Sequence, residues 1–299
     1  MNAHTDPRIS RHIKAGEAPF QVSFEFFPPK TDVMEERFWD SVTKLAPLHP
    51  RFVSVTYGAG GTTRERTLRM VSQIQSQTGV NAAAHLTCVG ASRAEVDAVV
   101  RGYKEAGITR IVAVRGDPPE GVGKPFVAHP DGYKSAAELV EGIRKIGDFD
   151  ISVSAYPEKH PQASSWDVEI DNLKRKFDLG ATRAITQMFF ENNDYFRFID
   201  RARKAGITQS IVPGIQPIHS FKQIAGFASR CGTSIPHWLA ERFDGLDDEP
   251  DTHALVASAV AAEQVLELVD AGVTEFHFYT LNRSNLVLAL ARLLGVRPD

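Results

Sequence analysis

The sequence predicts a single-domain (β/α)8 barrel of the α/β class, and three observations support this prediction. Eight short runs rich in β-branched and apolar residues alternate with stretches of helical periodicity, which is typical of parallel strands joined by helices. The strand runs are nearly continuous in apolar residues, as in a sheet that is covered on both faces. The chain has 299 residues, 42% of them hydrophobic, so it can form one large barrel with a sizeable core.

The expected elements follow one another in regular alternation. In chain order, the strands are 22–27, 52–57, 82–87, 110–115, 151–156, 183–190, 210–215 and 274–280. The helix-like stretches lie near 33–46, 62–77, 92–106, 135–146, 167–178, 193–204, 220–229 and 252–270, with a ninth at 284–294. Several turns from helix to strand carry the glycine that commonly ends a helix in the left-handed conformation, namely Gly79, Gly107, Gly147, Gly180, Gly206 and Gly272.

The domain organisation expected from these units is a short N-terminal extension, 1–20, followed by the barrel, 21–299. Residues 231–251 look like an insertion after the seventh helix. An open, doubly wound sheet is the alternative architecture. The first turn from strand to helix argues against it, because this turn is FFPPKT and not the GxGxxG of a dinucleotide-binding sheet.

Composition excludes several classes of partner. The formal net charge is -3, from 34 basic and 37 acidic residues, so there is no electrostatic footprint for nucleic acid or an anionic membrane. Cys88 and Cys231 are far apart in the sequence, which fits a reducing compartment without disulfides or structural zinc. The polar N-terminus lacks the apolar core of a signal peptide, and no apolar run reaches the length of a membrane span. We therefore expect a cytoplasmic protein with a small diffusible partner.

Polar residues gather where the expected strands end, which is where barrel enzymes carry their active sites. The most distinctive is Glu25, which lies among aromatic residues in FEFFPP. Apolar surroundings raise the pKa of a carboxyl group and so suit a general acid near neutral pH; pairing with a buried arginine is the structural alternative. The other polar residues at these ends include Thr56, Tyr57, His85, Arg115, Asp117, Tyr156, His160, Gln187, Tyr279, Asn282 and Arg283.

Three further segments allow both a functional and a structural interpretation. The glycine-rich segment 57–67, YGAGGTTRERT, leads into a helix and could hold phosphate, although a tight turn is the more common explanation. RGDPP, at 115–119, places opposite charges beside a cofactor or in a loop-closing salt bridge. Asn172, Arg175 and Lys176 are spaced to share one helix face, which is either a binding face or a solvated one. No HExxH or GxSxG motif is present.

Ten motifs occur in the order seen in methylenetetrahydrofolate reductases, namely FEFFPPKT, YGAGG, AHLTC, RGDPP, AYPEKHP, NLKRKFDLGA, ITQMFF, PGIQPI, FDGLDD and FHFYTLNR. From about residue 20 to the C-terminus, the sequence therefore resembles the bacterial-type catalytic barrel of this family. The resemblance implies a barrel that binds FAD. NADH or NADPH would reduce the flavin, and the flavin would reduce 5,10-methylenetetrahydrofolate to 5-methyltetrahydrofolate, a step of one-carbon metabolism and methionine biosynthesis.

The resemblance also implies roles for individual residues. Glu25 is similar to the general acid that assists opening of the five-membered ring to an iminium ion, and Asp117 to the aspartate that stabilises this cation. The positions that match folate contacts are Gln187, which would contact the pterin edge, Gln223, Phe227 and Arg283. The positions that match flavin contacts are Thr56, Tyr57, Ala59, His85, Arg115, Gly116, Asp117, Ala136, Tyr156, His160, Asn172, Arg175 and Lys176, of which the last two would supply cations for the pyrophosphate.

Some positions depart from the family pattern. Ser135 and Ala136 stand where many members have tyrosine and alanine, with Tyr133 two positions early; Glu169 replaces a common aspartate, and Gln216 an apolar residue. The partners implied are folate and a second copy of the chain in a homo-oligomer, without nucleic acid or membrane. Two other functions stay open: a different FAD-dependent barrel oxidoreductase, resembling proline dehydrogenase, and a folate-binding barrel that transfers a methyl group.

Overall fold

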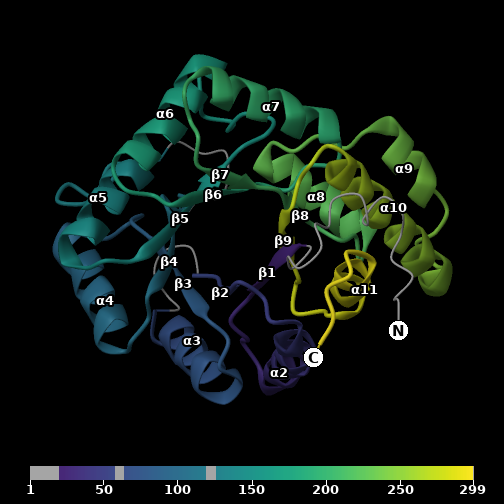
Figure 1. Ribbon diagram of the computed structural model, residues 1–299, viewed down its shortest axis with the longest axis horizontal. Helices are drawn as coiled ribbons and strands as arrows, with labels where there is room; N and C mark the ends of the chain where they lie inside the picture. The colour runs from purple at the N-terminus through teal and green to yellow at the C-terminus, as the bar shows by residue number, and fades with distance from the viewer. Residues whose placement is uncertain (1–19, 58–63, 119–125, 299) are drawn as a thin grey trace.

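The structure is a computed structural model that describes residues 20–57, 64–118 and 126–298. Parallel strands form its centre and helices surround them (Figure 1). The strands are β1 (Gln21–Phe26), β2 (Val53–Val55), β3 (Ala82–Thr87), β4 (Arg110–Val114), β5 (Asp150–Ala155), β6 (Arg183–Thr186), β7 (Ser210–Val212), β8 (Gly214–Ile215) and β9 (Glu275–Tyr279). Their order in the sheet is β7-β6-β5-β4-β3-β2-β1-β9-β8. Successive strands therefore pair with each other except β7 with β8, and β1 also pairs with β9.

Proline divides the seventh expected strand into β7 and β8. Pro213 has no N–H with which to extend a ladder, although its carbonyl oxygen accepts a hydrogen bond from the backbone N–H of His277 at 3.0 Å. The half before the proline pairs with β6, and the half after it pairs with β9. β7 and β8 stand at the two ends of the strand order, and the chain through Pro213 joins them, which closes the sheet into a barrel. The (β/α)8 barrel is confirmed, and the open-sheet alternative is wrong.

The helices lie where the helical periodicity predicts them. They are α2 (Asp32–Leu45), η1 (Ala46–Leu48), α3 (Arg64–Thr78), α4 (Arg93–Glu105), α5 (Ala136–Ile146), α6 (Trp166–Asp178), α7 (Asn192–Lys204), α8 (Phe221–Cys231), α9 (His237–Phe243), α10 (Pro250–Asp270) and α11 (Asn285–Leu293). Hydroxyl side chains cap the first turns of α2, α4, α5, α6 and α8 by accepting a backbone N–H, which explains where these helices begin. The segment expected as an insertion forms α9 and leads into α10.

Helix α10 meets the length and hydropathy of a membrane span. It nevertheless packs against α7, α9 and α11, and Ala257, Val265 and Leu268 on it are fully buried. A helix buried in the core of a protein can have the same length and hydropathy as a membrane span. Helix α10 therefore belongs to the layer of helices around the sheet.

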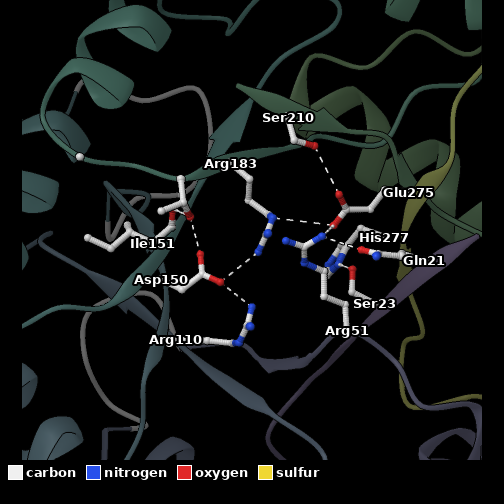
Figure 2. Close-up of polar contacts among 12 residues, drawn as sticks. Gln21, Ser23, Arg51, Arg110, Asp150, Ile151, Arg183, Ser210, Glu275 and His277 are labelled. Atoms are coloured by element: carbon white, nitrogen blue, oxygen red, sulfur yellow. Dashed lines mark hydrogen bonds and ion pairs between the residues drawn. The ribbon is translucent and has the colours of Figure 1, made fainter. Parts of the chain in front are cut away.

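The amino-terminal end of the barrel contains an ionic cluster (Figure 2). Asp150 Oδ2 lies 2.5 Å from Arg110 Nη1 and 3.3 Å from Arg183 Nη1. Glu275 Oε1 lies 3.6 Å from Arg51 Nη1 and 3.7 Å from Arg183 Nε. Because these residues stand at or just before the first position of their strands, their charges fill the end of the barrel opposite the usual active site.

Candidate active site

Glu25 lies inside the barrel towards the carboxyl ends of the strands. In β1, Val22, Phe24 and Phe26 are buried in the apolar core, and the two-residue period of a strand turns Ser23 and Glu25 to the opposite face. The Glu25 side chain is only 12% exposed, and its Oε2 lies 3.3 Å from His85 Nε2 and 3.6 Å from His277 Nε2. A carboxylate between two imidazoles is therefore the centre of the site.

The partners of Glu25 correct two expectations. Burial raises the pKa of this carboxyl group, as the aromatic sequence context predicts, but His85 and His277 together lower it to about 2. The expected raised pKa of Glu25 is therefore wrong. The structural alternative is wrong as well, because the basic side chains that the described residues place against the carboxylate are histidines and not an arginine.

His277 is a site residue that the sequence predictions missed. Its side chain is fully buried, and its Nδ1 lies 2.8 Å from Ser23 Oγ. Its ring stacks on Phe52 at 5.9 Å and meets Tyr279 edge-on at 5.4 Å. The available signal was the alternation in β9, where Glu275, His277 and Tyr279 share the inward face of a strand whose other residues are phenylalanines.

Arg115, Gly116 and Asp117 follow β4 at the mouth of the barrel. Gly116 has φ +88, and a Cβ there would lie 2.5 Å from Val89 Cγ1, so only glycine fits. The Arg115 guanidinium lies 4.5 Å from the centre of the Phe126 ring. Among the described residues it makes no ion pair with Asp117, which leaves the Asp117 carboxylate exposed, and partial desolvation raises the pKa of Asp117 despite the nearby Arg115. The predicted loop-closing salt bridge is therefore absent.

Tyr156 and His160 stand next to this loop, after β5. Their rings meet edge-on at 4.6 Å. Burial raises the pKa of Tyr156 to about 12, and burial together with Arg115 lowers the pKa of His160 to about 4. Tyr156 also interacts electrostatically with Asp117 and Arg115. The structure therefore brings the predicted residues of β4 and β5 together at one side of the mouth.

The predicted polar face of α6 is divided in the structure. Asn172 and Arg175 are exposed, whereas Lys176 is 9% exposed and its Nζ donates to the carbonyl oxygen of Ser154 at 2.8 Å. Burial lowers the pKa of Lys176 to about 8, although the nearby Glu169 acts in the opposite direction. The interpretation as one shared, solvated face is therefore wrong for Lys176. Its ammonium group reaches from the helix to the end of β5, close to Arg115.

The residues predicted to contact folate lie on three segments. Gln187, after β6, is partly buried, and its Oε1 accepts the backbone N–H of Met188 at 2.9 Å. Gln223 and Phe227 are exposed one turn apart on α8. Arg283 is exposed after β9, and the two residues before it, Leu281 and Asn282, have φ of 50° and 55°.

The remaining predicted positions have simple placements. Thr56 and Tyr57 directly follow β2, with Tyr57 8% exposed, and Ala136 is the buried first residue of α5. The departure from the family pattern at Ser135 supplies the cap of this helix. Gln216 is buried, and its amide donates to the carbonyl oxygen of Pro217. Ala59 and the extension before residue 20 lie outside the described residues.

Two polar atoms on β3 are buried without a hydrogen bond to the described residues. They are Thr87 Oγ1 and His85 Nε2, the second of which lies 3.3 Å from the Glu25 carboxylate. Such atoms usually have a hydrogen-bond partner when a protein is complete with its ligands. Within residues 20–57, 64–118 and 126–298, no group of three or more histidine, cysteine and carboxylate side chains could hold a metal ion. The arrangement suits an organic ligand with polar edges, bound over Glu25.

The fold and this mouth together define an enzyme of the (β/α)8-barrel class, with its polar groups at the carboxyl ends of the strands. The family model described as methylenetetrahydrofolate reductase matches residues 8–295. The chain belongs to the methylenetetrahydrofolate reductase family, as the motifs in its sequence predict.

Individual relatives agree with this family. The chain is 50% identical to 5,10-methylenetetrahydrofolate reductase of Pectobacterium carotovorum, covering 100% of this chain and 98% of that protein. It is 48% identical to the enzyme of the same name from Escherichia coli, covering 97% and 96%. Among solved structures, a protein of Clostridium thermocellum that binds two copies of 5-methyl-5,6,7,8-tetrahydrofolic acid has a TM-score of 0.59 at 14% identity, covering 92% and 93%, which supports the fold.

Proposed function

We propose that this protein reduces 5,10-methylenetetrahydrofolate to 5-methyltetrahydrofolate with electrons from NADH or NADPH, using bound FAD. The observation that carries the proposal is the Glu25 carboxylate, held inside the mouth of the barrel between two imidazoles. This arrangement provides proton transfer in a largely water-excluded place, and the family membership supplies the reaction. FAD, when bound, supplies the hydride.

The residues present fit a flavin dinucleotide. On the side of the mouth formed by β3, β4 and β5, Thr87 Oγ1 and His85 Nε2 are buried without a hydrogen bond to the described residues. This side also has two cations, Arg115 and the buried Lys176, whose electrostatic interaction with each other lowers the pKa of Lys176 further. Anionic phosphates bound here would relieve that repulsion. We infer that these residues, with Tyr156 and His160, hold the cofactor.

Glu25 would protonate N10 of the folate and so open the five-membered ring to a cationic iminium form. Asp117 is the exposed carboxylate at the same mouth, and its negative charge would stabilise that cation. Gln187 presents a carboxamide, which both donates and accepts hydrogen bonds and therefore suits a pterin edge. Gln223, Phe227 and Arg283 lie on segments that can cover the rest of the folate.

An anaerobic stopped-flow experiment tests the proposal. The purified yellow protein is reduced with NADH or NADPH, then mixed with 5,10-methylenetetrahydrofolate while flavin absorbance and product are measured. We expect reoxidation of the flavin with one 5-methyltetrahydrofolate formed per flavin. A colourless protein that binds folate would favour a methyl-transfer or binding barrel, and a flavin reoxidised by a cyclic amine but not by the folate would favour the proline dehydrogenase-like alternative.

A further inference from the structure

The interior of the barrel beneath Glu25 is polar, whereas bulky branched residues usually fill the interior of such barrels. His277 is its centre. This side chain is fully buried, and its Nε2 makes no hydrogen bond to the described residues. The carboxylate of Glu25, 3.6 Å away, is the ionisable group that Nε2 faces most closely. A buried nitrogen without a hydrogen bond lowers the stability of the folded protein. The position of Nε2 beside a carboxylate therefore calls for a functional explanation.

Ser23 determines which nitrogen of His277 can exchange a proton. Ser23 Oγ lies 2.8 Å from His277 Nδ1 and 3.3 Å from the carbonyl oxygen of Phe276. A hydroxyl group has one proton, and the carbonyl oxygen can only accept it. The hydroxyl oxygen therefore accepts a hydrogen bond from Nδ1–H. Because Nδ1 keeps its proton in both states of the ring, His277 gains and loses a proton at Nε2, the atom that faces Glu25.

We propose that His277 is a positioning residue that stores, next to Glu25, the proton used in folate reduction. The inference rests on the proposed function and deepens it. In the proposed resting state the proton is on Nε2 and Glu25 is ionised. During the reaction the Nε2–H bond breaks, Glu25 receives that proton and passes it to N10 of the folate, and the imidazole remains neutral with Nδ1–H on Ser23. A proton from water at the mouth restores the pair, and no electrons are transferred in these steps.

The charges around the pair support this role. With both imidazoles near it, Glu25 has a pKa of about 2, so the carboxyl group alone would hold no proton at neutral pH. Below His277, Phe52 separates its ring from two guanidinium groups, each within 5.8 Å of the Phe52 ring centre. The ionisable groups on the mouth side of His277 are Glu25 and Tyr279, which contact it, and His85, which contacts Glu25. Those at the amino-terminal end of the barrel are the ionic cluster of Arg51, Arg110, Arg183, Asp150 and Glu275. Three arginines and two carboxylates leave one formal positive charge in excess there.

His85 faces the same carboxylate but differs in its surroundings. It lies on the side of the mouth where the flavin would bind, and its side chain is 10% exposed. His277 lies deeper and is held by Ser23. We therefore assign the stored proton to His277, and a His85→Gln variant tests that assignment in parallel.

The first test measures protonation of Glu25 directly in the flavin-loaded protein without folate. Infrared spectra of protein with carbon-13-labelled glutamate are recorded between about pH 5 and 8, and a Glu25→Gln variant identifies the Glu25 band. We expect an ionised Glu25 throughout in the unmodified protein. In His277→Gln we expect a protonated carboxyl band at the acidic end, because burial still raises the pKa of Glu25 while one of the two opposing imidazoles is gone.

The second test measures the pH dependence of both half-reactions. In His277→Gln the folate half-reaction should lose about 10–10²-fold between about pH 5 and 8, because it now follows the titration of Glu25 alone. Its midpoint should lie at lower pH than in the unmodified protein, and acid should restore the rate. Reduction of the flavin should change less than about twofold, because that step needs no proton from Glu25.

A matched control removes a buried imidazole elsewhere. His253 is 8% exposed and accepts the backbone N–H of Phe221 through Nε2 at 3.1 Å. His253→Gln should leave the pH midpoint unchanged even if the protein becomes less stable. An unchanged Glu25 band and midpoint in His277→Gln, or equal slowing of both half-reactions that acid does not restore, would overturn the inference. An effect found only in His85→Gln would overturn it too. Failure of the unmodified reduced protein to react with the folate would instead overturn the proposed function, because the infrared test needs no folate.

Discussion

Lys176 provides a quantitative test of how the cofactor side of the mouth is built. Its side chain is 9% exposed, and burial lowers its pKa from 10.5 to about 8. A buried cation costs stability in the free protein, whereas anionic phosphates nearby would compensate this cost. We therefore predict that Lys176→Met stabilises the flavin-free protein near neutral pH and weakens the retention of FAD.

The magnitude follows from the pKa. A pKa lowered from 10.5 to about 8 means that folding disfavours the charged lysine by about 3 kcal/mol near neutral pH. The substitution also removes the hydrogen bond to Ser154, worth about 1.5 kcal/mol. The net gain is about 1–2 kcal/mol, or about 2–6 °C in Tm for a chain of this size. The cost of the charge is full below the folded pKa and disappears as the pH rises towards 10.5, so the advantage of the variant should shrink at alkaline pH.

Thermal unfolding of the flavin-free proteins near pH 7 and near pH 10, with a fluorescence titration of FAD, measures both effects. Lys174→Met is the matched control, because Lys174 is half-exposed on the same helix and pairs with Asp178 at 3.0 Å. This control should change the free energy of unfolding by less than about 0.5 kcal/mol and leave FAD binding intact. A Lys176→Met protein that is less stable at both pH values, or that binds FAD as tightly as before, would refute the reasoning.

Three other substitutions give separate tests. Asp117→Asn should slow the folate half-reaction about 5–150-fold more than flavin reduction and raise the flavin midpoint potential; an unchanged potential with equal loss in both rates would argue against an electrostatic role. Arg175→Ala should release FAD at an unchanged Tm, because Arg175 is exposed, and stoichiometric flavin after dialysis would show that Arg175 does not bind it. Gly142→Ala should lower the free energy of unfolding by about 1–3 kcal/mol, because a Cβ there would lie 2.0 Å from Tyr133 Oη, and an unchanged urea midpoint would contradict this packing.

The barrel could be predicted from the sequence because each strand is a short apolar run that can be recognised from its own residues. β3 has the predicted bounds, 82–87; β4 ends one residue earlier than predicted, and β1 and β5 are each shifted by one residue towards the N-terminus. The seventh strand differs because Pro213 interrupts its ladder. Even this break preserves the predicted eight-unit order, because both halves find parallel partners.

The electrostatics of the site could not be predicted in the same way. The aromatic neighbours of Glu25 indicate burial, but the imidazoles that lower its pKa come from strands that lie 60 and 252 positions later in the chain, at His85 and His277. The burial of Lys176 likewise depends on the contact between α6 and the end of β5. Helical spacing places three polar residues near one another without showing which of them points towards the sheet.

The most direct test of the central claim is the anaerobic folate half-reaction of the FAD-loaded protein, compared with that of Glu25→Gln. After reduction by NADH or NADPH, the unmodified protein should transfer its electrons to 5,10-methylenetetrahydrofolate and form one 5-methyltetrahydrofolate per flavin. Glu25→Gln should accept electrons from the nicotinamide at a similar rate and reduce the folate about 10²–10⁴-fold more slowly. A reduced, flavin-loaded protein that does not react with the folate would contradict the proposed function, and equal rates in both proteins would contradict the role of Glu25.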